Sequence, residues 1–139
     1  MLNISRIINN FYSWKQNIKV SFSTLFSYLN VKIYLVILLF INLTNWLFTR
    51  YITSEIDQPQ IALHYSVDFG INLYGDINKI YILPLLGTIF IVINFVILSI
   101  LARYNVKDIK FNSHLLFLTA LIANIILLGA IISIYIINF

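Results

Sequence analysis

Three long runs of apolar residues account for much of the chain, at about residues 33–51, 80–102 and 115–137. A helix needs about 20 mostly apolar residues to cross the hydrocarbon core of a bilayer, and each run meets that length. The second and third runs contain no charged residue, whereas the first is interrupted by Asn42 and Thr44 but framed by Lys32 and Arg50. A buried helix of a soluble protein is the alternative for the first run, but the other two leave no soluble core for it to enter. The pattern predicts an all-α membrane protein with three transmembrane helices.

Residues 1–30 show a different pattern, in which apolar residues recur every three or four positions and polar residues occupy the opposite face. The apolar positions are Ile4, Ile7, Ile8, Phe11, Trp14, Ile18, Phe22, Leu25 and Leu29. Together with Arg6, Lys15 and Lys19, this stripe is typical of a basic amphipathic helix that lies among lipid headgroups. Docking of the stripe on a protein partner is the alternative. We therefore divide the chain into an interfacial helix over 1–30 and a transmembrane domain over 31–139.

The connection between the first two spans, residues 52–79, has an extended character. Apolar and polar residues alternate from Gln60 to Gly70, and a period of two is the signal of a β-strand. Gly70 and Gly75 are typical turn positions. The pattern predicts a short β-hairpin or a single strand that lies on the membrane surface.

The same connection and the start of the next span contain His64-Tyr65, Asn72, Tyr74-Gly75 and Pro84. In these residues the chain resembles the small bacterial membrane domain that also opens the SdpI-type immunity proteins, and it is similar to uncharacterised multi-pass proteins of candidate-phyla bacteria. The chain departs from the family pattern at Ala62, Ser66 and Gly70. The resemblance covers about residues 58–101 and implies a protein of the bacterial plasma membrane with a role in toxin immunity or signalling. We call His64, Tyr65, Asp68, Gly70, Asn72, Tyr74, Gly75 and Pro84 the external motif.

Charge predicts how the chain is oriented in the membrane. Lysine and arginine predominate in residues 1–32 and 103–114, whereas residues 50–79 hold four acidic residues against two basic ones. Because cytoplasmic segments carry an excess of lysine and arginine, we expect the N-terminus and the 103–114 loop in the cytoplasm. The 52–79 loop and the C-terminus then lie outside.

Composition agrees with a membrane protein and narrows the chemistry. Apolar residues make up 60% of the chain and charged residues 10%, whereas soluble domains carry about 25% charged residues. The net charge of +4 comes from short segments between the helices and not from a basic stripe, so we expect no nucleic-acid partner. The absence of cysteine excludes disulfides and thiolate metal sites. We find no catalytic or cofactor motif, so we expect neither an enzyme nor a bound cofactor.

The two histidines cannot act together in one protomer, because the predicted topology places His64 outside and His114 inside the membrane. His64 with Asp68 and Asp76 is a candidate external metal or proton site, and the two aspartates are a weaker candidate for a catalytic carboxylate pair. A solvated turn with structural hydrogen bonds is the favoured interpretation, so no metal is expected.

Each predicted span carries a side-chain amide. Asn42, Asn94 and Asn124 lie about 8–10 residues, or roughly 12–15 Å, from the cytoplasmic ends of the apolar runs, and Asn45 lies one turn beyond Asn42. An amide that faces lipid leaves its hydrogen-bonding groups unpaired, so we expect the four to face inward and bond one another. A polar conducting path is the alternative. The corresponding lipid-facing positions are Phe40, Val92 and Ile122, and the small residues expected at close helix contacts are Gly87, Ser99, Ala120 and Gly129.

Three functions are compatible with these features. The favoured one is a non-enzymatic accessory or assembly subunit that contacts a larger membrane partner. The partners expected are the lipid bilayer and either other membrane protein subunits or a second copy of the chain. The second is an immunity or sensing protein that acts through residues 64–75, and the third is an oligomeric transporter or channel subunit.

Overall fold

The computed structural model describes residues 4–56, 58–66, 68, 70–104 and 106–139. In chain order the elements are α1 (Ile4–Ser27), α2 (Leu29–Glu55), β1 (Gln60–Ser66), β2 (Gly70–Asp76), the 3-10 helix η1 (Ile77–Tyr81), α3 (Ile82–Tyr104), the 3-10 helix η2 (Val106–Asp108) and α4 (Ile109–Asn138).

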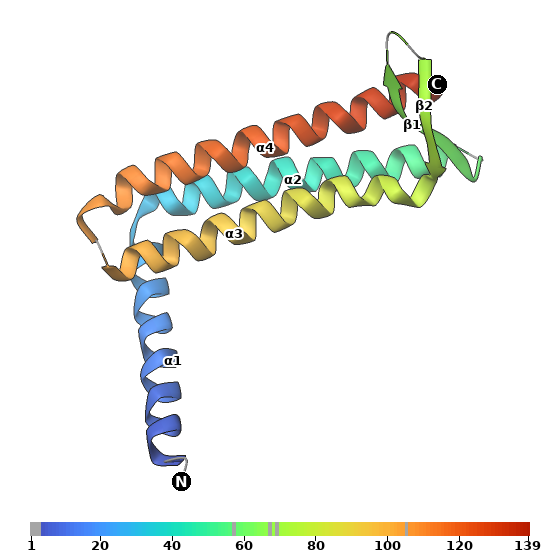
Figure 1. The fold of residues 1–139 in the computed structure, drawn as a ribbon. Helices are drawn as coiled ribbons and strands as arrows, with labels where there is room; N and C mark the ends of the chain where they lie inside the picture. Colours follow the sequence, from blue (N-terminus) through green and yellow to red (C-terminus); the bar gives the residue numbers. More distant parts are fainter. Residues whose placement is uncertain (1–3, 57, 67, 69, 105) are drawn as a thin grey trace.

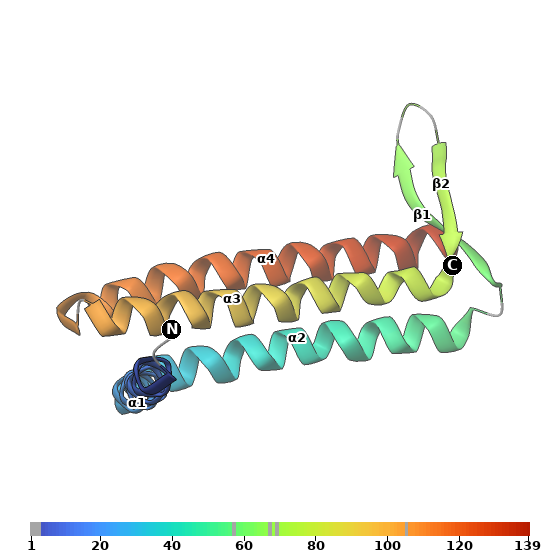
Figure 2. The ribbon, with the colours of Figure 1, turned by 60° about the horizontal axis from the view of Figure 1, so that its bottom comes forward.

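Helices α2, α3 and α4 lie side by side in one bundle (Figures 1 and 2). Among the described residues, three helices are long and apolar enough to cross a membrane, over Leu29–Glu55, Ile77–Arg103 and Ile109–Asn138. The predicted all-α membrane fold with three spans is therefore confirmed. Each of these helical segments extends beyond the apolar run that predicted it.

Helix α1 runs crosswise to the bundle and meets α2 at a single non-helical residue, Tyr28 (Figure 1). Tyr28 has extended backbone angles (φ −86°, ψ 118°), and its N–H donates to the Leu25 carbonyl at 3.1 Å. The rings of Phe22 and Phe26 contact the ring of Phe95 on α3, with centroids 5.3 and 5.9 Å apart. The last turns of α1 are therefore held against the bundle.

In the described part of the chain, the buried apolar side chains form three clusters along the bundle. At the end next to α1, Leu25 packs with Val31, Leu98, Ala102 and Ile109. The middle cluster contains Leu38, Ile91 and Ala120. At the opposite end, Ile52, Ile131 and Ile134 of α2 and α4 pack with Ile61 of β1 and Ile80 of η1. We call these two extremities the α1 end and the hairpin end.

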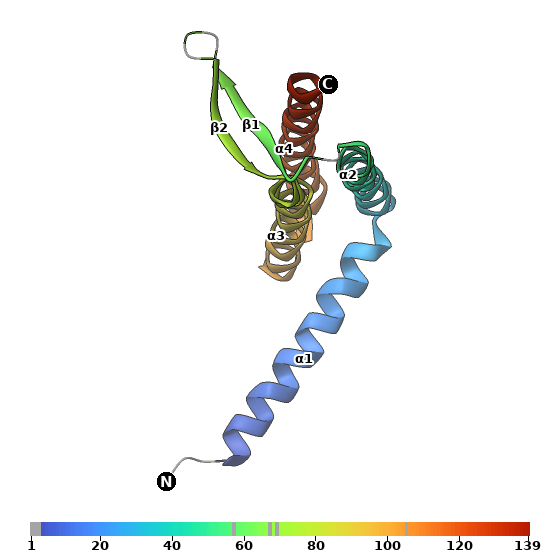
Figure 3. The ribbon, with the colours of Figure 1, turned by 90° about the vertical axis from the view of Figure 1, so that its right-hand side faces the viewer.

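Strands β1 and β2 form an antiparallel hairpin that projects sideways from the hairpin end (Figures 2 and 3). Of the two alternatives for this segment, the hairpin is therefore the one observed. Gly70 has a φ of +68°. A residue with a side chain rarely adopts such an angle, so glycine suits the position where β2 begins. The register shifts between Ala62, His64 and Tyr65, so the alternation of faces does not hold along the whole strand.

One side chain that the sequence did not single out, Asn138, hydrogen-bonds α4 to the hairpin. The Asn138 amide donates to the Ala62 carbonyl and accepts from the Ala62 N–H, both at 2.9 Å. Ile61 and Ala62 are both buried, although strict alternation places them on opposite faces. Ile61 enters the cluster at the hairpin end, and Asn138 bonds the backbone of its neighbour.

We expect Asn138→Leu to loosen the hairpin without unfolding the helices. The substitution leaves the buried N–H and carbonyl of Ala62 unpaired, which costs about 1–3 kcal/mol per group. Hydrogen exchange in bilayer-reconstituted protein should show faster exchange in β1 and β2 and unchanged exchange in α3. Leu73→Ala, at an exposed hairpin position, is the matched control. Equal protection of the hairpin in both variants would show that Asn138 is not its anchor.

Candidate functional site

Among the described residues, a connected set of polar side chains lies inside the bundle, and Asn42 is its centre. The Asn42 Nδ2 donates to the Asn124 Oδ1 and to the Pro84 carbonyl, each at 3.1 Å. The Asn42 Oδ1 accepts from the Thr88 hydroxyl at 2.9 Å. One side chain of α2 therefore bonds both α3 and α4.

Neighbouring residues extend this arrangement, which we call the amide cluster (Asn42, Asn45, Pro84, Thr88 and Asn124). The Asn45 Nδ2 donates to the Asn124 carbonyl at 3.2 Å, and the Asn124 Nδ2 donates to the Ala120 carbonyl of its own helix at 3.0 Å. The Trp46 Nε1 donates to the Thr88 hydroxyl at 3.3 Å. The three asparagines are buried, so these bonds replace the water that the amides give up.

Asn94 was expected in this layer, and the structure places it elsewhere. Its Nδ2 donates to the Phe90 carbonyl of its own helix at 3.0 Å. The expected depths were counted from the ends of the apolar runs. Helices α2 and α4 begin several residues before their apolar runs, whereas α3 ends close to the end of its run. Asn42 and Asn124 therefore lie deeper in the bundle than Asn94. Pro84 and Thr88, nearer the hairpin end, supply the α3 partners instead.

Gly87 allows α3 to approach the amide cluster. A Cβ at this position would lie 2.5 Å from both the Asn124 Oδ1 and the Asn42 Nδ2, so a side chain would displace the amides. Ala120 is also fully buried, and Ser99 is half-buried with its hydroxyl bonded to the Phe95 carbonyl. Gly129 differs from the expectation, because a Cβ there would meet nothing within 4 Å. The side chains expected to face lipid, Phe40, Val92 and Ile122, are 69%, 55% and 48% exposed.

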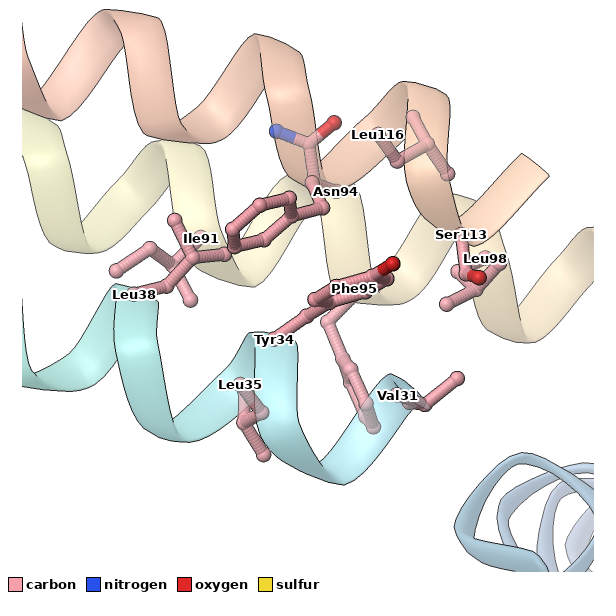
Figure 4. A pocket seen from close by; sticks show the side chains of 11 residues that line it. Val31, Tyr34, Leu35, Leu38, Ile91, Asn94, Phe95, Leu98, Ser113 and Leu116 are labelled. Carbon is pink, nitrogen blue, oxygen red and sulfur yellow. The ribbon is translucent and has the colours of Figure 1, made fainter. Parts of the chain in front are cut away.

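A small apolar pocket of about 40 Å³ lies between the three helices nearer the α1 end (Figure 4). Asn94 and Ser113 line it together with apolar side chains such as Leu38, Ile91 and Phe95. Tyr34 also lines it, stacks on Phe117 at a centroid distance of 4.2 Å, and hydrogen-bonds through its hydroxyl to the His114 Nδ1. His114 therefore links α4 to α2 at the end of the bundle opposite the hairpin.

The external motif is spread over the hairpin and the start of α3. The side chains of His64, Tyr65 and Asn72 lie outside the described residues, and Asp68 and Tyr74 are exposed. Gly75 is buried, and a Cβ there would lie 2.5 Å from the Leu63 Cδ1. Pro84 is buried too, and its carbonyl belongs to the amide cluster. The motif is therefore partly a set of packing positions.

The two aspartates of the hairpin segment, Asp68 and Asp76, lie at opposite ends of the hairpin and do not form a pair. Asp68 is in the turn between the strands, whereas Asp76 ends β2 opposite Gln60. The Asp76 Oδ1 accepts from the backbone N–H of Asn78 at 2.7 Å and from its Nδ2 at 2.9 Å, which caps η1. Across the part of the chain that the structure describes, no three histidine or carboxylate side chains gather as metal ligands.

The residues expected at the membrane surface all lie on α1. Lys15 and Lys19 are exposed, while the side chains of Arg6 and Trp14 lie outside the described residues.

Comparisons of this chain with protein-family models, with curated protein sequences and with solved structures find no match. The likeness of residues 58–101 to the SdpI-type domain therefore stays a prediction.

We expect Gly87→Ala to destabilise the bundle by about 1–3 kcal/mol, the usual range for an overpacked core. The added methyl group would push apart the Asn42–Asn124 pair. Gly129→Ala is the matched control, because its methyl group meets open space and alanine favours a helix over glycine by up to about 1 kcal/mol. Unfolding by SDS in mixed micelles measures both variants. A loss of stability in Gly129→Ala as large as in Gly87→Ala would contradict the role of the amide cluster.

Proposed function

We propose that this chain is a non-enzymatic integral membrane protein that serves as an accessory or assembly subunit of a larger membrane complex. The main support for the proposal is the position of helix α1 and the hairpin, the two elements outside the bundle. Helix α1 and the hairpin project sideways from opposite ends of the three apolar helices (Figures 1 and 3). With the bundle across a bilayer, each would extend along one membrane face, where neighbouring subunits are reached.

The hairpin offers the more specific contact surface. Ile71, Leu73 and Tyr74 of β2 are exposed, although they lie outside the apolar helices. Large apolar side chains left exposed outside the membrane-spanning helices are candidates for an interaction surface. In an accessory subunit these three side chains would meet a partner.

Helix α1 would anchor the subunit to the opposite face. Phe11 and Leu25 lie fourteen positions apart, about four turns, and so nearly share one face of the helix. Leu25 is buried in the bundle, whereas Phe11 is 65% exposed. On this arrangement the apolar stripe would continue along α1 from the side that meets the bundle and would face lipid once the bundle is inserted. Lys15 and Lys19 would reach anionic headgroups.

Co-purification tests the accessory role directly. Extraction of the tagged protein in mild detergent should yield a different subunit in fixed stoichiometry, and the variant Leu73→Ser, Tyr74→Ser should lose it while it keeps its helical content. A homo-oligomer without another subunit would instead favour a transporter or channel subunit. A monomer in both samples would exclude the accessory role.

We expect the N-terminus and the loop between α3 and α4 in the cytoplasm, because positive charge concentrates there. The chain has no cysteine, so single cysteines report position without further engineering. Ser54→Cys should react with an impermeant thiol reagent on intact cells, and Asn112→Cys should react only after permeabilisation. The reverse pattern would invert the orientation.

If α1 lies in the headgroup layer, its two faces should differ in depth. A fluorophore on Phe11→Cys should be quenched by lipids brominated on their acyl chains, whereas one on Ser13→Cys, from the opposite face, should be quenched weakly. Equal and weak quenching at both positions in bilayers would show that the stripe docks on a protein instead.

A further inference from the structure

Two polar atoms, one in the amide cluster and one next to it, have no hydrogen-bond partner within the described chain. They are the Asn45 Oδ1 and the Thr49 Oγ1, and both residues are completely buried. Buried polar atoms are paired in the great majority of cases, so each unpaired one calls for an explanation. Complete burial also means that neither lipid nor another protein can reach these atoms from outside.

Thr49 is the more informative of the two. In a helix, the hydroxyl of a threonine commonly bonds a carbonyl three or four residues earlier. The threonine before it and the threonine after it in α2 do so. Thr44 donates to the Phe40 carbonyl at 3.0 Å, and Thr53 donates to the Arg50 carbonyl at 2.9 Å. Thr49 makes no such bond. Its hydroxyl is therefore available to a partner other than its own backbone.

The two atoms are placed to share one partner. Asn45 and Thr49 are four residues apart, so their Cβ atoms are about 5–6 Å apart on one face of α2. The same face bonds Asn124 through Asn45 and packs on Ile131 through Ile52, so both atoms lie between α2 and α4. Two hydrogen bonds of about 2.8 Å span such a separation through a single bridging oxygen. The Asn45 Nδ2 is held by the Asn124 carbonyl, and this contact fixes where the Oδ1 points.

The chemistry of the pair selects a small neutral donor. The Asn45 Oδ1 only accepts, and the Thr49 hydroxyl donates or accepts. The three apolar runs hold no aspartate or glutamate, and Arg50 follows Thr49 directly, so a cation would be buried without a counter-charge. We propose that one internal water molecule binds between α2 and α4, where it donates to the Asn45 Oδ1 and hydrogen-bonds the Thr49 hydroxyl.

This water would lengthen the amide cluster toward the hairpin end. The hydrogen-bonded series would run from Thr88 through Asn42, Asn124 and Asn45 to Thr49. The water would complete the pairing of the polar groups that join α2 to α4.

Two measurements on the full chain test the site. In bilayers, solid-state NMR should show magnetisation transfer from water protons to the side-chain amide of Asn45. The transfer should disappear in Thr49→Val, which removes the hydroxyl at nearly constant shape, and persist in Thr49→Ser, which keeps it. In SDS titration, Thr49→Val should unfold at a lower SDS fraction than the wild type. Thr44→Val is the matched control, because its hydroxyl bonds only its own helix at a lipid-exposed position, and its midpoint should shift less.

The direction in which Thr49→Val shifts the SDS unfolding midpoint distinguishes a bound water from a site that binds none. If no water binds, the valine removes an unpaired buried hydroxyl, and the midpoint should rise. A raised midpoint, or no transfer from water to Asn45 in the wild type, would overturn the proposal. If Thr49→Val does not fold, Thr49→Ser and the wild type still decide it, since both must show the transfer.

Discussion

The Asn42 side chain fixes how the three helices face one another. In lipid the apolar faces of a helix gain little from meeting each other, because acyl chains solvate them as well as a neighbouring helix does. Many large apolar side chains are accordingly exposed on the outer faces of the bundle. An amide, by contrast, loses its hydrogen bonds if it turns toward lipid. Because Asn42 bonds Asn124 on α4 and Pro84 and Thr88 on α3, a rotation of any of the three helices breaks a contact.

The spans and the hairpin could be predicted because they depend on local patterns. The length of an apolar run sets whether a helix can cross a bilayer, and alternation that ends at a turn residue such as Gly70 sets a hairpin. The partners of the amides could not be predicted in the same way. These partners depend on where each helix begins and on how it is rotated about its axis. For this reason Pro84 and Thr88 of α3, and not Asn94, bond Asn42.

Asn138 escaped prediction for a related reason. A polar residue at the end of an apolar run is expected at a membrane interface in any case. The presence of an asparagine there therefore does not indicate a specific contact. Its partner, the backbone of Ala62, is 76 positions away and has no side-chain chemistry to recognise. The register shift beside Ala62 offers no clue in the sequence either. Contacts of a side chain with a distant backbone are those that pattern analysis misses most readily.

The hairpin would have little stability without the bundle. An isolated two-stranded hairpin is marginal in water, and this one consists of two strands of seven residues each. It is held at its base by Ile61 in the apolar cluster and by Asn138, and it continues through η1 into α3, where Pro84 meets Asn42. The hairpin surface therefore depends on the same helix arrangement that the amide cluster sets. A change that rotates α3 or α4 within the membrane should alter the surface that the hairpin presents, even though no residue of the hairpin has changed.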